Sequence, residues 1–186
     1  MSHLKNGLLA VVAAAVAIGL VAARPVPAHA GGGDNVVVAV NTQDGRFLYR
    51  VRLAIKRTND DVVDEANAAV AVASCTECQT VAVAIEGLLV LSDPSTFTPT
   101  NLALAMNVDC SFCATLASAY QFAVQVDGPA HLSGAGHRAI AEIRADLQAL
   151  RREGLDIWEL QARVDELAQR LLQVLLTEVE TPPGRQ

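Results

Sequence analysis

The stretch "SCTECQTVAVAI", from Ser74 to Ile85, places a Cys-x-x-Cys pair directly before an apolar segment. The pattern returns as "DCSFCATLASAY", from Asp109 to Tyr120, at a shift of 35 residues. At this shift Thr80 also falls on Thr115. The further matches are Ala82 with Ala117, Ala84 with Ala119 and, upstream, Ala68 with Ala103. We interpret the two stretches as a duplicated unit, since coincidence in an Ala- and Val-rich chain is the weaker explanation for cysteines and threonines in register.

Each unit is predicted to contain a short helix, a Cys-x-x-Cys turn and a strand. Alanine and acidic residues favour a helix in the leading segments, Asp64–Ala73 and Asn101–Asn107. The alternation in "AAVAVAS" also fits a strand, so this alternative stays open. The segments after the cysteines, Val81–Leu91 and Leu116–Val126, are richer in Val, Thr, Ile and Tyr and therefore favour strands.

Two further segments precede the duplicated unit. Val36–Asn41 has the composition of a strand, and Asp44-Gly45 is a strong turn signal. Phe47–Lys56 alternates between polar and apolar residues, which indicates a half-buried strand. Together these segments predict a β-hairpin, and with the two strands of the repeat they predict one small sheet of about four strands.

The C-terminal third predicts two helices. A first apolar stripe consists of Ile140, Ile143, Leu147 and Leu150, and a second of Leu160, Val164, Leu167, Leu171, Val174 and Leu175. Asp156 followed by Glu159 resembles a capping box at the start of the second helix. The two helices, joined by a short loop, form an αα-hairpin that we expect to cover the sheet.

The N-terminus predicts an export signal over residues 1–30. Leu8–Ala23 is uninterrupted Gly, Ala, Val, Leu and Ile, and Ala28-His29-Ala30 is a small-x-small cleavage pattern. The apolar run is shorter than the roughly 20 residues of a membrane-spanning helix; an uncleaved N-terminal anchor is the alternative. We therefore predict a flexible leader at 31–35, a single α+β domain at 36–179 and a disordered tail at 180–186.

The net charge and the expected removal of the export signal limit the functions that this chain can have. The chain has 14 Lys plus Arg against 20 Asp plus Glu, a formal net charge of −6 at pH 7. Such an acidic chain, with no basic patch in its sequence, argues against binding nucleic acid or an anionic membrane surface. With the export signal removed we expect no membrane association and a secreted or extracytoplasmic location in the cell envelope.

Three interpretations of the cysteines remain open, and structural disulfides are favoured. An even number of cysteines in an exported domain is typical of disulfides, and each copy of a duplicated unit would bring its own bond. The expected disulfide residues are Cys75 with Cys78 and Cys110 with Cys113, and bonds between the units are the second choice. A four-cysteine zinc site has a permitted spacing, and a thiol–disulfide enzyme would use either pair. Zinc, however, requires reduced thiolates in an oxidising compartment.

No catalytic signature accompanies the cysteines. His131 and His137 lie six residues apart without the His-Glu-x-x-His pattern of a hydrolytic zinc site. They are expected to be loop and helix-start residues. We therefore predict no catalytic residue, no cofactor and no metal ligand.

The runs "NAAVAVASCTECQTVAVAI" and "CSFCATLASAYQFAV", followed by the amphipathic helical tail, resemble a family of poorly characterised bacterial exported proteins. They are also similar to the non-catalytic extracytoplasmic portion of some peptide zinc metalloproteases. The resemblance covers roughly Asn35 to Val179 and carries no protease residue onto this chain. It implies an accessory domain of the envelope that handles or binds peptides.

The sequence as a whole predicts an α+β domain of duplicated helix–CxxC–strand units, covered by a C-terminal αα-hairpin. Its expected function is that of an exported, disulfide-stabilised, non-enzymatic accessory or binding domain for a protein or peptide partner. The alternatives are an extracytoplasmic thiol–disulfide oxidoreductase and a four-cysteine zinc-binding domain.

Overall fold

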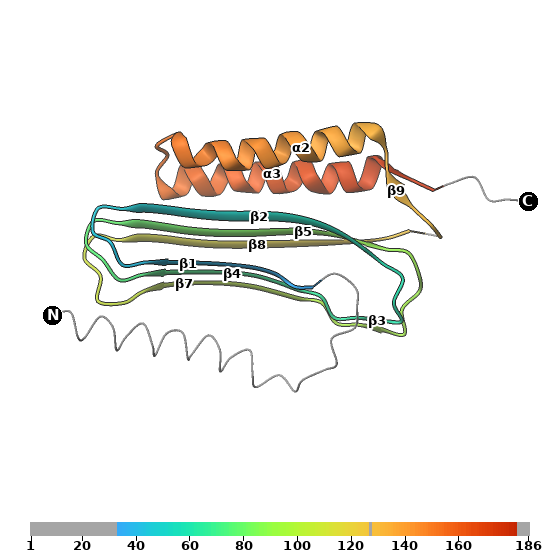
Figure 1. The fold of residues 1–186 in the computed structure, drawn as a ribbon, viewed down its shortest axis with the longest axis horizontal. Coiled ribbons are helices and arrows are strands. Elements are labelled where there is room, and N and C mark those ends of the chain that lie inside the picture. The colour runs from blue at the N-terminus through green and yellow to red at the C-terminus, as the bar shows by residue number, and fades with distance from the viewer. Residues whose placement is uncertain (1–32, 127, 182–186) are drawn as a thin grey trace, which may run out of the picture. The chain divides into compact units, whose positions relative to one another are not determined.

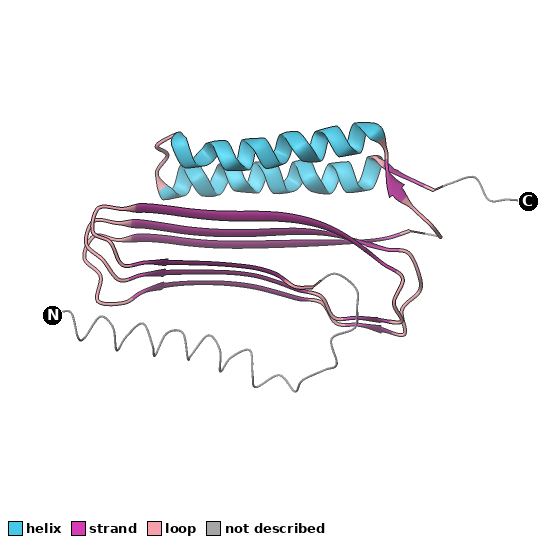
Figure 2. Ribbon diagram, viewed as in Figure 1, coloured by secondary structure: helices cyan, strands magenta, loops and turns pink. Residues whose placement is uncertain are grey.

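The computed structural model describes residues 33–126 and 128–181, and its main strands form two parallel sheets of three strands each (Figure 1). The first sheet contains, in spatial order, β1 (Asn35–Asn41), β4 (Ala66–Ala73) and β7 (Thr100–Asn107). The second contains β2 (Phe47–Thr58), β5 (Gln79–Val90) and β8 (Ala114–Gln125). Two helices cover the outer face of the second sheet (Figure 2). The mixture of strands and a C-terminal helix pair is confirmed, but two parallel sheets replace the single sheet of about four strands.

The strands are arranged as a parallel β-solenoid. Each circuit of the chain, here called a rung, adds one short strand to the first sheet and one long strand to the second. The first rung is β1 and β2, the second β4 and β5, and the third β7 and β8, with parallel pairing between successive rungs. Two short strands, β3 (Val62–Val63) and β6 (Thr96–Phe97), also pair in parallel on the way from one rung to the next.

The predicted β-hairpin is wrong, although both of its strands exist. β1 pairs with β4 and β2 with β5, so the two strands lie in different sheets. Val37 of β1 and Leu48 of β2 both belong to the apolar cluster between the sheets. The turn at Gly45, which has a φ of 66°, therefore carries the chain across the solenoid and does not join neighbouring strands.

The predicted helices at Asp64–Ala73 and Asn101–Asn107 are also wrong, because these segments form β4 and β7. Alanine has the highest intrinsic helix propensity, but propensity is a weak preference compared with packing. Ala69 and Ala71 are fully buried between the sheets, on one side of a strand that pairs on both edges. The alternation in "AAVAVAS" was therefore the informative signal, and alanine serves here as a small inward-facing residue.

The duplication is confirmed, with one adjustment to its register. In the pairing of β5 with β8, Thr80 lies beside Thr115 as predicted. In the pairing of β4 with β7, Ala69 lies beside Ala103, whereas the uniform shift of 35 had placed Ala68 there. The third rung accommodates an extra residue before its cysteines, and Asp109 at that position has a left-handed backbone with a φ of 48°.

The first rung is a third copy of the unit, which the sequence analysis did not identify. It aligns with the second rung at a shift of 32 residues and has an Asp-Gly turn where the later rungs have cysteines. The signal in the sequence was an asparagine at or next to the start of each short strand: Asn35, Asn67 and Asn101. These three residues lie side by side across the first sheet.

This asparagine ladder ties the two sheets together. The side-chain amide of Asn35 donates to Oδ1 of Asn67 at 2.7 Å, and Asn67 donates to Oδ1 of Asn101 at 2.7 Å. Each asparagine also donates to backbone carbonyls of the second sheet, which for Asn67 belong to Ala84 and Tyr120. The ladder thus satisfies buried carbonyls across the solenoid, where an unpaired group would be costly.

We expect Asn67→Ala to lower the free energy of unfolding by about 2 kcal/mol, because it leaves buried amide and carbonyl groups without partners. Asn101→Ala is the matched control, since Asn101 is exposed on the last rung and its loss should cost less than about 1 kcal/mol. Urea denaturation measures both values. Equal losses for the two variants would contradict a ladder whose buried middle member matters most.

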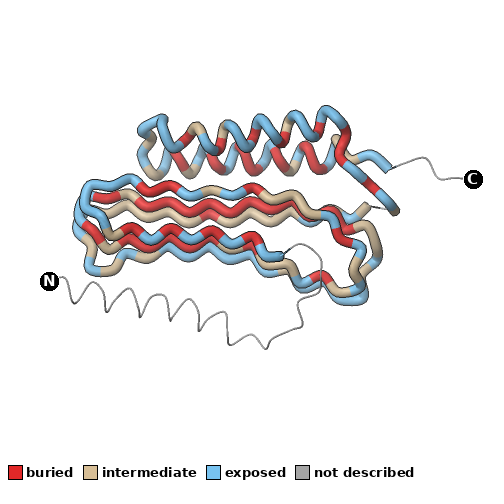
Figure 3. Tube along the Cα trace, in the orientation of Figure 1, coloured by how far each residue is buried: buried red, intermediate tan, exposed pale blue. Residues whose placement is uncertain are grey.

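The helical layer matches the prediction. α2 (Gly134–Ala149) continues through a short 3-10 turn, η1 (Leu150–Arg152), and α3 (Ile157–Thr177) returns beside α2. All residues of both predicted apolar stripes are buried, and Figure 3 shows buried segments recurring along both helices. The capping box of Asp156 and Glu159 is present at the start of α3. The largest apolar core lies between these helices and the second sheet, on its face that carries Val81, Val83 and Ile85.

A short antiparallel ribbon joins the two ends of the helical layer. β9 (His131–Leu132) precedes α2, and β10 (Val179–Glu180) follows α3 and pairs with it. Glu180, the first residue of the predicted tail, is therefore part of a strand. The predicted signal at residues 1–30 and the remainder of the tail from 182 lie outside the described residues.

Tyr49 connects the solenoid to the helical layer. Its phenol donates a hydrogen bond to the backbone carbonyl of Leu147 at 2.9 Å, and the residue is buried. Burial, with a smaller contribution from the carboxylate of Glu153, raises the pKa of Tyr49 well above its ordinary value. The folded chain therefore keeps this proton at alkaline pH, where the unfolded chain loses it.

Tyr49→Phe is expected to lower stability at pH 7 by about 1 kcal/mol, because the buried Leu147 carbonyl loses its donor. The wild-type free energy of unfolding should fall as the pH rises above about 10, the ordinary tyrosine pKa, since only the unfolded state then releases the proton. The variant should show a shallower fall, measured by urea denaturation from pH 8 to 11. An unchanged slope would exclude Tyr49 as its source.

Candidate functional site

The two Cys-x-x-Cys motifs form the turns that lead from the short strand to the long strand in the second and third rungs. The third residue of each turn has a left-handed backbone, with φ values of 52° for Glu77 and 56° for Phe112. Such a conformation is uncommon for residues with a side chain. It brings the two cysteines of each motif together, with Cα atoms 6.1 Å apart in the first pair and 6.0 Å in the second.

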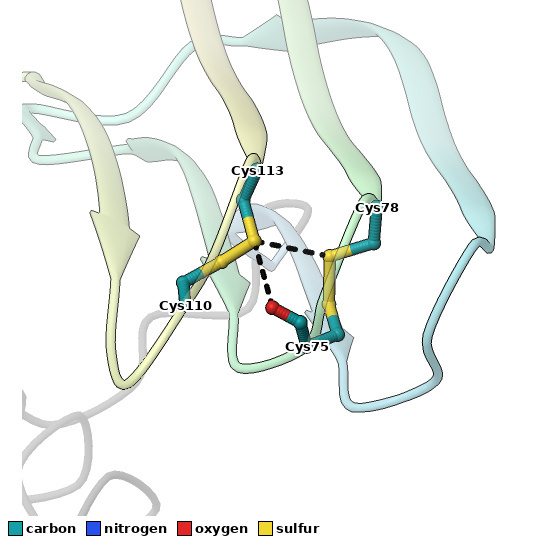
Figure 4. A group of neighbouring side chains, drawn as sticks. All are labelled: Cys75, Cys78, Cys110 and Cys113. Atoms are coloured by element: carbon teal, nitrogen blue, oxygen red, sulfur yellow. Dashed lines mark hydrogen bonds between the residues drawn. A yellow bond between two sulfur atoms is a disulfide. The ribbon is translucent and has the colours of Figure 1, made fainter.

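The sulfur atoms lie at disulfide distance within each motif, between Cys75 and Cys78 and between Cys110 and Cys113. This is the pairing that the sequence favoured, rather than bonds between the units. The two pairs stack directly on each other, as Figure 4 shows, with 3.4 Å between Sγ of Cys78 and Sγ of Cys113. We refer to this stack of four residues as the cysteine ladder.

The backbone holds the two turns of the cysteine ladder in register. The amide of Glu77 donates to the carbonyl of Ser111 at 2.8 Å, and the amide of Ser111 donates to the carbonyl of Cys75 at 3.2 Å. A third bond, from Ala114 to Cys78, follows at 3.0 Å. The sulfur positions are thus fixed by the same parallel pairing that aligns the strands.

Burial differs between the two cysteine pairs. Cys75 and Cys78 are each 3% exposed, whereas Cys110 and Cys113 belong to the last rung and are partly exposed. Both motifs are preceded and followed by strands. No helix therefore begins at these cysteines to lower their thiol pKa, which is the arrangement that activates a redox Cys-x-x-Cys.

The two ends of the solenoid differ in charge and exposure. The third rung pairs with another described strand on one side only, and its strands β7 and β8 contain no Asp, Glu, Lys or Arg. Its inward-facing residues Ala103 and Ala105 are exposed. In the first rung, by contrast, the inward positions of β2 carry Arg50 and Arg52, which lie beside the interior residues Ala82 and Ala84.

Inward-pointing charges are a common protection of a sheet edge against pairing with another chain. In the first rung β2 has this protection while β1 is uncharged, and in the third rung neither strand has it. The third-rung edge, defined as the sides of β7 and β8 that pair with no described strand, is therefore the open end of the solenoid. Sequence reasoning missed it because strand order, and hence which strand lies at an edge, is not visible in the chain's local pattern.

The exposed aromatic residue Phe112 lies at the turn of the same rung and is 88% exposed. A left-handed conformation disfavours a bulky side chain by about 1–2 kcal/mol relative to glycine. The aromatic ring of Phe112 therefore faces solvent from a backbone conformation that is unfavourable for its residue type.

The two histidines are placed together, but not in a catalytic arrangement. His137 lies in the first turn of α2, as expected for a helix-start residue, and His131 lies in β9. Both line a pocket of about 310 Å³ with Arg57 and Arg144. His131 faces Glu180, with 3.6 Å between Nε2 and Oε2. Arginine, histidine and aliphatic side chains line this pocket, and no serine, threonine or cysteine is among the described residues that line it.

A cluster of ionised and polar side chains is buried between the two sheets of the solenoid. Glu86 is fully buried, forms an ion pair with Lys56 at 2.8 Å between Nζ and Oε2, and accepts a hydrogen bond from Gln121 at 3.0 Å. Lys56 also contacts Glu65 at 2.6 Å. Burial lowers the pKa of Lys56, but its bonds to the two carboxylates outweigh burial and raise it. The cluster is thus internally paired and structural.

Comparison with known proteins adds no functional assignment: no protein-family model, curated protein or solved structure matches this chain. Within residues 33–126 and 128–181, no helix is long and apolar enough to span a membrane.

Cys110→Ser is expected to redistribute the disulfides. The variant leaves the Cys113 thiol unpaired, 3.4 Å from Sγ of Cys78 in the parent structure, within reach for thiol–disulfide exchange. A Cys78–Cys113 bond should then form and release Cys75 as the free thiol. Peptide mapping by mass spectrometry after alkylation identifies the bonded pair; Ser111→Ala is the control that keeps all four cysteines. Alkylation of Cys113 alone in the variant would contradict the exchange.

Proposed function

We propose that this chain is an exported, non-enzymatic binding domain whose disulfides stabilise a scaffold for a protein or peptide partner. The partner binds as an added strand along the third-rung edge. The observation that carries the proposal is the contrast between the solenoid's ends: at the third rung both strands are uncharged and the inward alanines of β7 are exposed, whereas at the first rung β2 carries Arg50 and Arg52 and the inward residues of β1 are buried.

Strand addition suits this edge for two reasons. Main-chain hydrogen bonds supply affinity when an extended peptide joins an exposed sheet edge, and β7 and β8 each have one such side. Charged side chains that would oppose an incoming strand are missing from both strands. A partner strand with small apolar residues facing Ala103 and Ala105 would continue the alanine interior of the solenoid.

Phe112 supports the same proposal. Aromatic residues are enriched at protein interfaces and often contribute most of the binding energy. Its ring is at the turn of the rung to which the partner would add, and its backbone conformation favours glycine. A bulky residue in a backbone conformation that it disfavours is a candidate for a role in binding.

The stabilising role proposed for the disulfides follows from their position. Each one closes the turn between the short and the long strand of its own rung, while backbone hydrogen bonds between the two turns set the register of the rungs. The small loops that they close constrain the unfolded chain little, so each is expected to contribute less than the ~3 kcal/mol of a 15-residue loop.

The test uses a display library of random 12-residue peptides, selected on the full chain. Ala105→Arg should abolish binding of the enriched peptides, because it copies onto the third rung the charge that protects the first. Ala141→Arg, on the exposed side of α2, adds the same charge away from the edge and should leave binding unchanged. Thermal denaturation checks that both variants are folded. Peptides that bind wild type and Ala105→Arg equally would refute the third-rung edge as the site.

Phe112→Gly separates binding from stability. Removing the side chain from a left-handed residue should raise stability by about 1 kcal/mol, while peptide affinity should fall by about tenfold, the loss of a modest interface contact. Glu77→Gly is the matched control: it relieves the same conformation in the second rung and should not weaken binding. Unchanged affinity in Phe112→Gly would remove Phe112 from the proposed interface.

A further inference from the structure

We propose that the cysteine ladder is a latent metal site: when both disulfides are reduced, its four thiolates bind one Zn²⁺ ion. This proposal is independent of the third-rung edge. It goes beyond a stabilising role for the disulfides, because it assigns the reduced form a ligand of its own.

The first observation is the convergence of the sulfurs. The four Sγ atoms come from two different rungs, yet all lie within 4.8 Å of one another. A tetrahedral zinc ion with Zn–S distances of about 2.3 Å requires sulfurs about 3.8 Å apart. Sγ of Cys78 and Sγ of Cys113, at 3.4 Å, are already near that separation. Breaking each disulfide lets the sulfurs within a pair move apart by side-chain rotation alone.

The second observation is that the backbone of the site does not depend on the disulfides. Three hydrogen bonds join the two turns, from Glu77 to Ser111, from Ser111 to Cys75 and from Ala114 to Cys78. The strands on either side are held by parallel pairing. Reduction therefore leaves the four thiols in a common frame, and two pairs of ligands on adjacent rungs suit the single-ion, four-cysteine type of zinc site.

Access and burial also fit a metal site. The inner pair is buried and would exclude water from two of the four ligands, while the outer pair is partly exposed and gives an approaching ion a path. Soft thiolate ligands favour Zn²⁺ over harder cations such as Mg²⁺ or Ca²⁺. The same four atoms thus hold either two covalent bonds or one ion, and never both.

The chemistry balances with a phosphine as reductant. Each disulfide, one phosphine and one water give two thiols and one phosphine oxide. Four thiols and Zn²⁺ then give the tetrathiolate complex of charge −2 and release four protons to the buffer. In the reverse direction, two molecules of a small-molecule disulfide oxidise the complex to two protein disulfides, release Zn²⁺ and become four thiolates.

The experiment titrates the full chain, reduced by a phosphine under anaerobic conditions, with Co²⁺ and then with Zn²⁺. We expect one Co²⁺ per chain, with sulfur-to-cobalt charge-transfer bands and the absorption of tetrahedral cobalt, and complete displacement by one Zn²⁺. The oxidised chain should bind neither ion. Native mass spectrometry should show a monomer whose neutral mass has gained one zinc and lost two hydrogens.

Variants test the ligand set. Replacing Cys110 and Cys113 together by serine leaves one cysteine pair and should abolish the tetrathiolate spectrum; Ser111→Ala keeps all four ligands and should bind as wild type. Circular dichroism follows the fold of the reduced chain. A reduced chain that keeps its fold and binds one equivalent of metal supports the site. A reduced, folded chain that binds no metal, or metal bound only between two chains, overturns it.

Discussion

Stacking of the rungs in parallel register is the constraint on which the rest of this structure depends. Each rung places the same kind of side chain over the one before it, so asparagine stacks on asparagine, alanine on alanine and cysteine pair on cysteine pair. Small inward residues allow the two sheets to face each other across a thin interior. Asparagine amides then satisfy carbonyls that this close approach would otherwise leave unpaired.

The helical layer supplies hydrophobic stabilisation that the thin interior of the solenoid does not provide. Alanine buries little apolar surface, so the interior between the sheets contributes less hydrophobic stabilisation than a core of larger residues. The outward face of the second sheet carries the larger side chains, and α2 and α3 cover them with two leucine-rich stripes. The domain thus combines a narrow interior, bridged by asparagine hydrogen bonds, with a core of large apolar side chains on one outer face.

Stacking also makes the two ends of the solenoid chemically different. The first rung has an Asp-Gly turn and inward arginines, and the third has a cysteine turn and uncharged strands. Our proposals assign separate roles to neighbouring parts of the third rung. Its open edge receives a partner strand, and its cysteines, with those of the second rung, set the redox state and metal content of the turn.

The sequence by itself determined the helical hairpin, its capping box and the strands after the cysteines, and it favoured, without deciding, a disulfide within each motif. These features depend on residues close together in the chain. It did not determine that Asp64–Ala73 is a strand or that the first two strands lie in different sheets, because alanine's helix propensity and an Asp-Gly turn are local signals. Only the tertiary structure decided the number of rungs, which strands lie at an edge and that all four sulfurs meet. Those features depend on contacts between residues about 32 to 35 positions apart, whose pairing is favourable only when the whole solenoid forms.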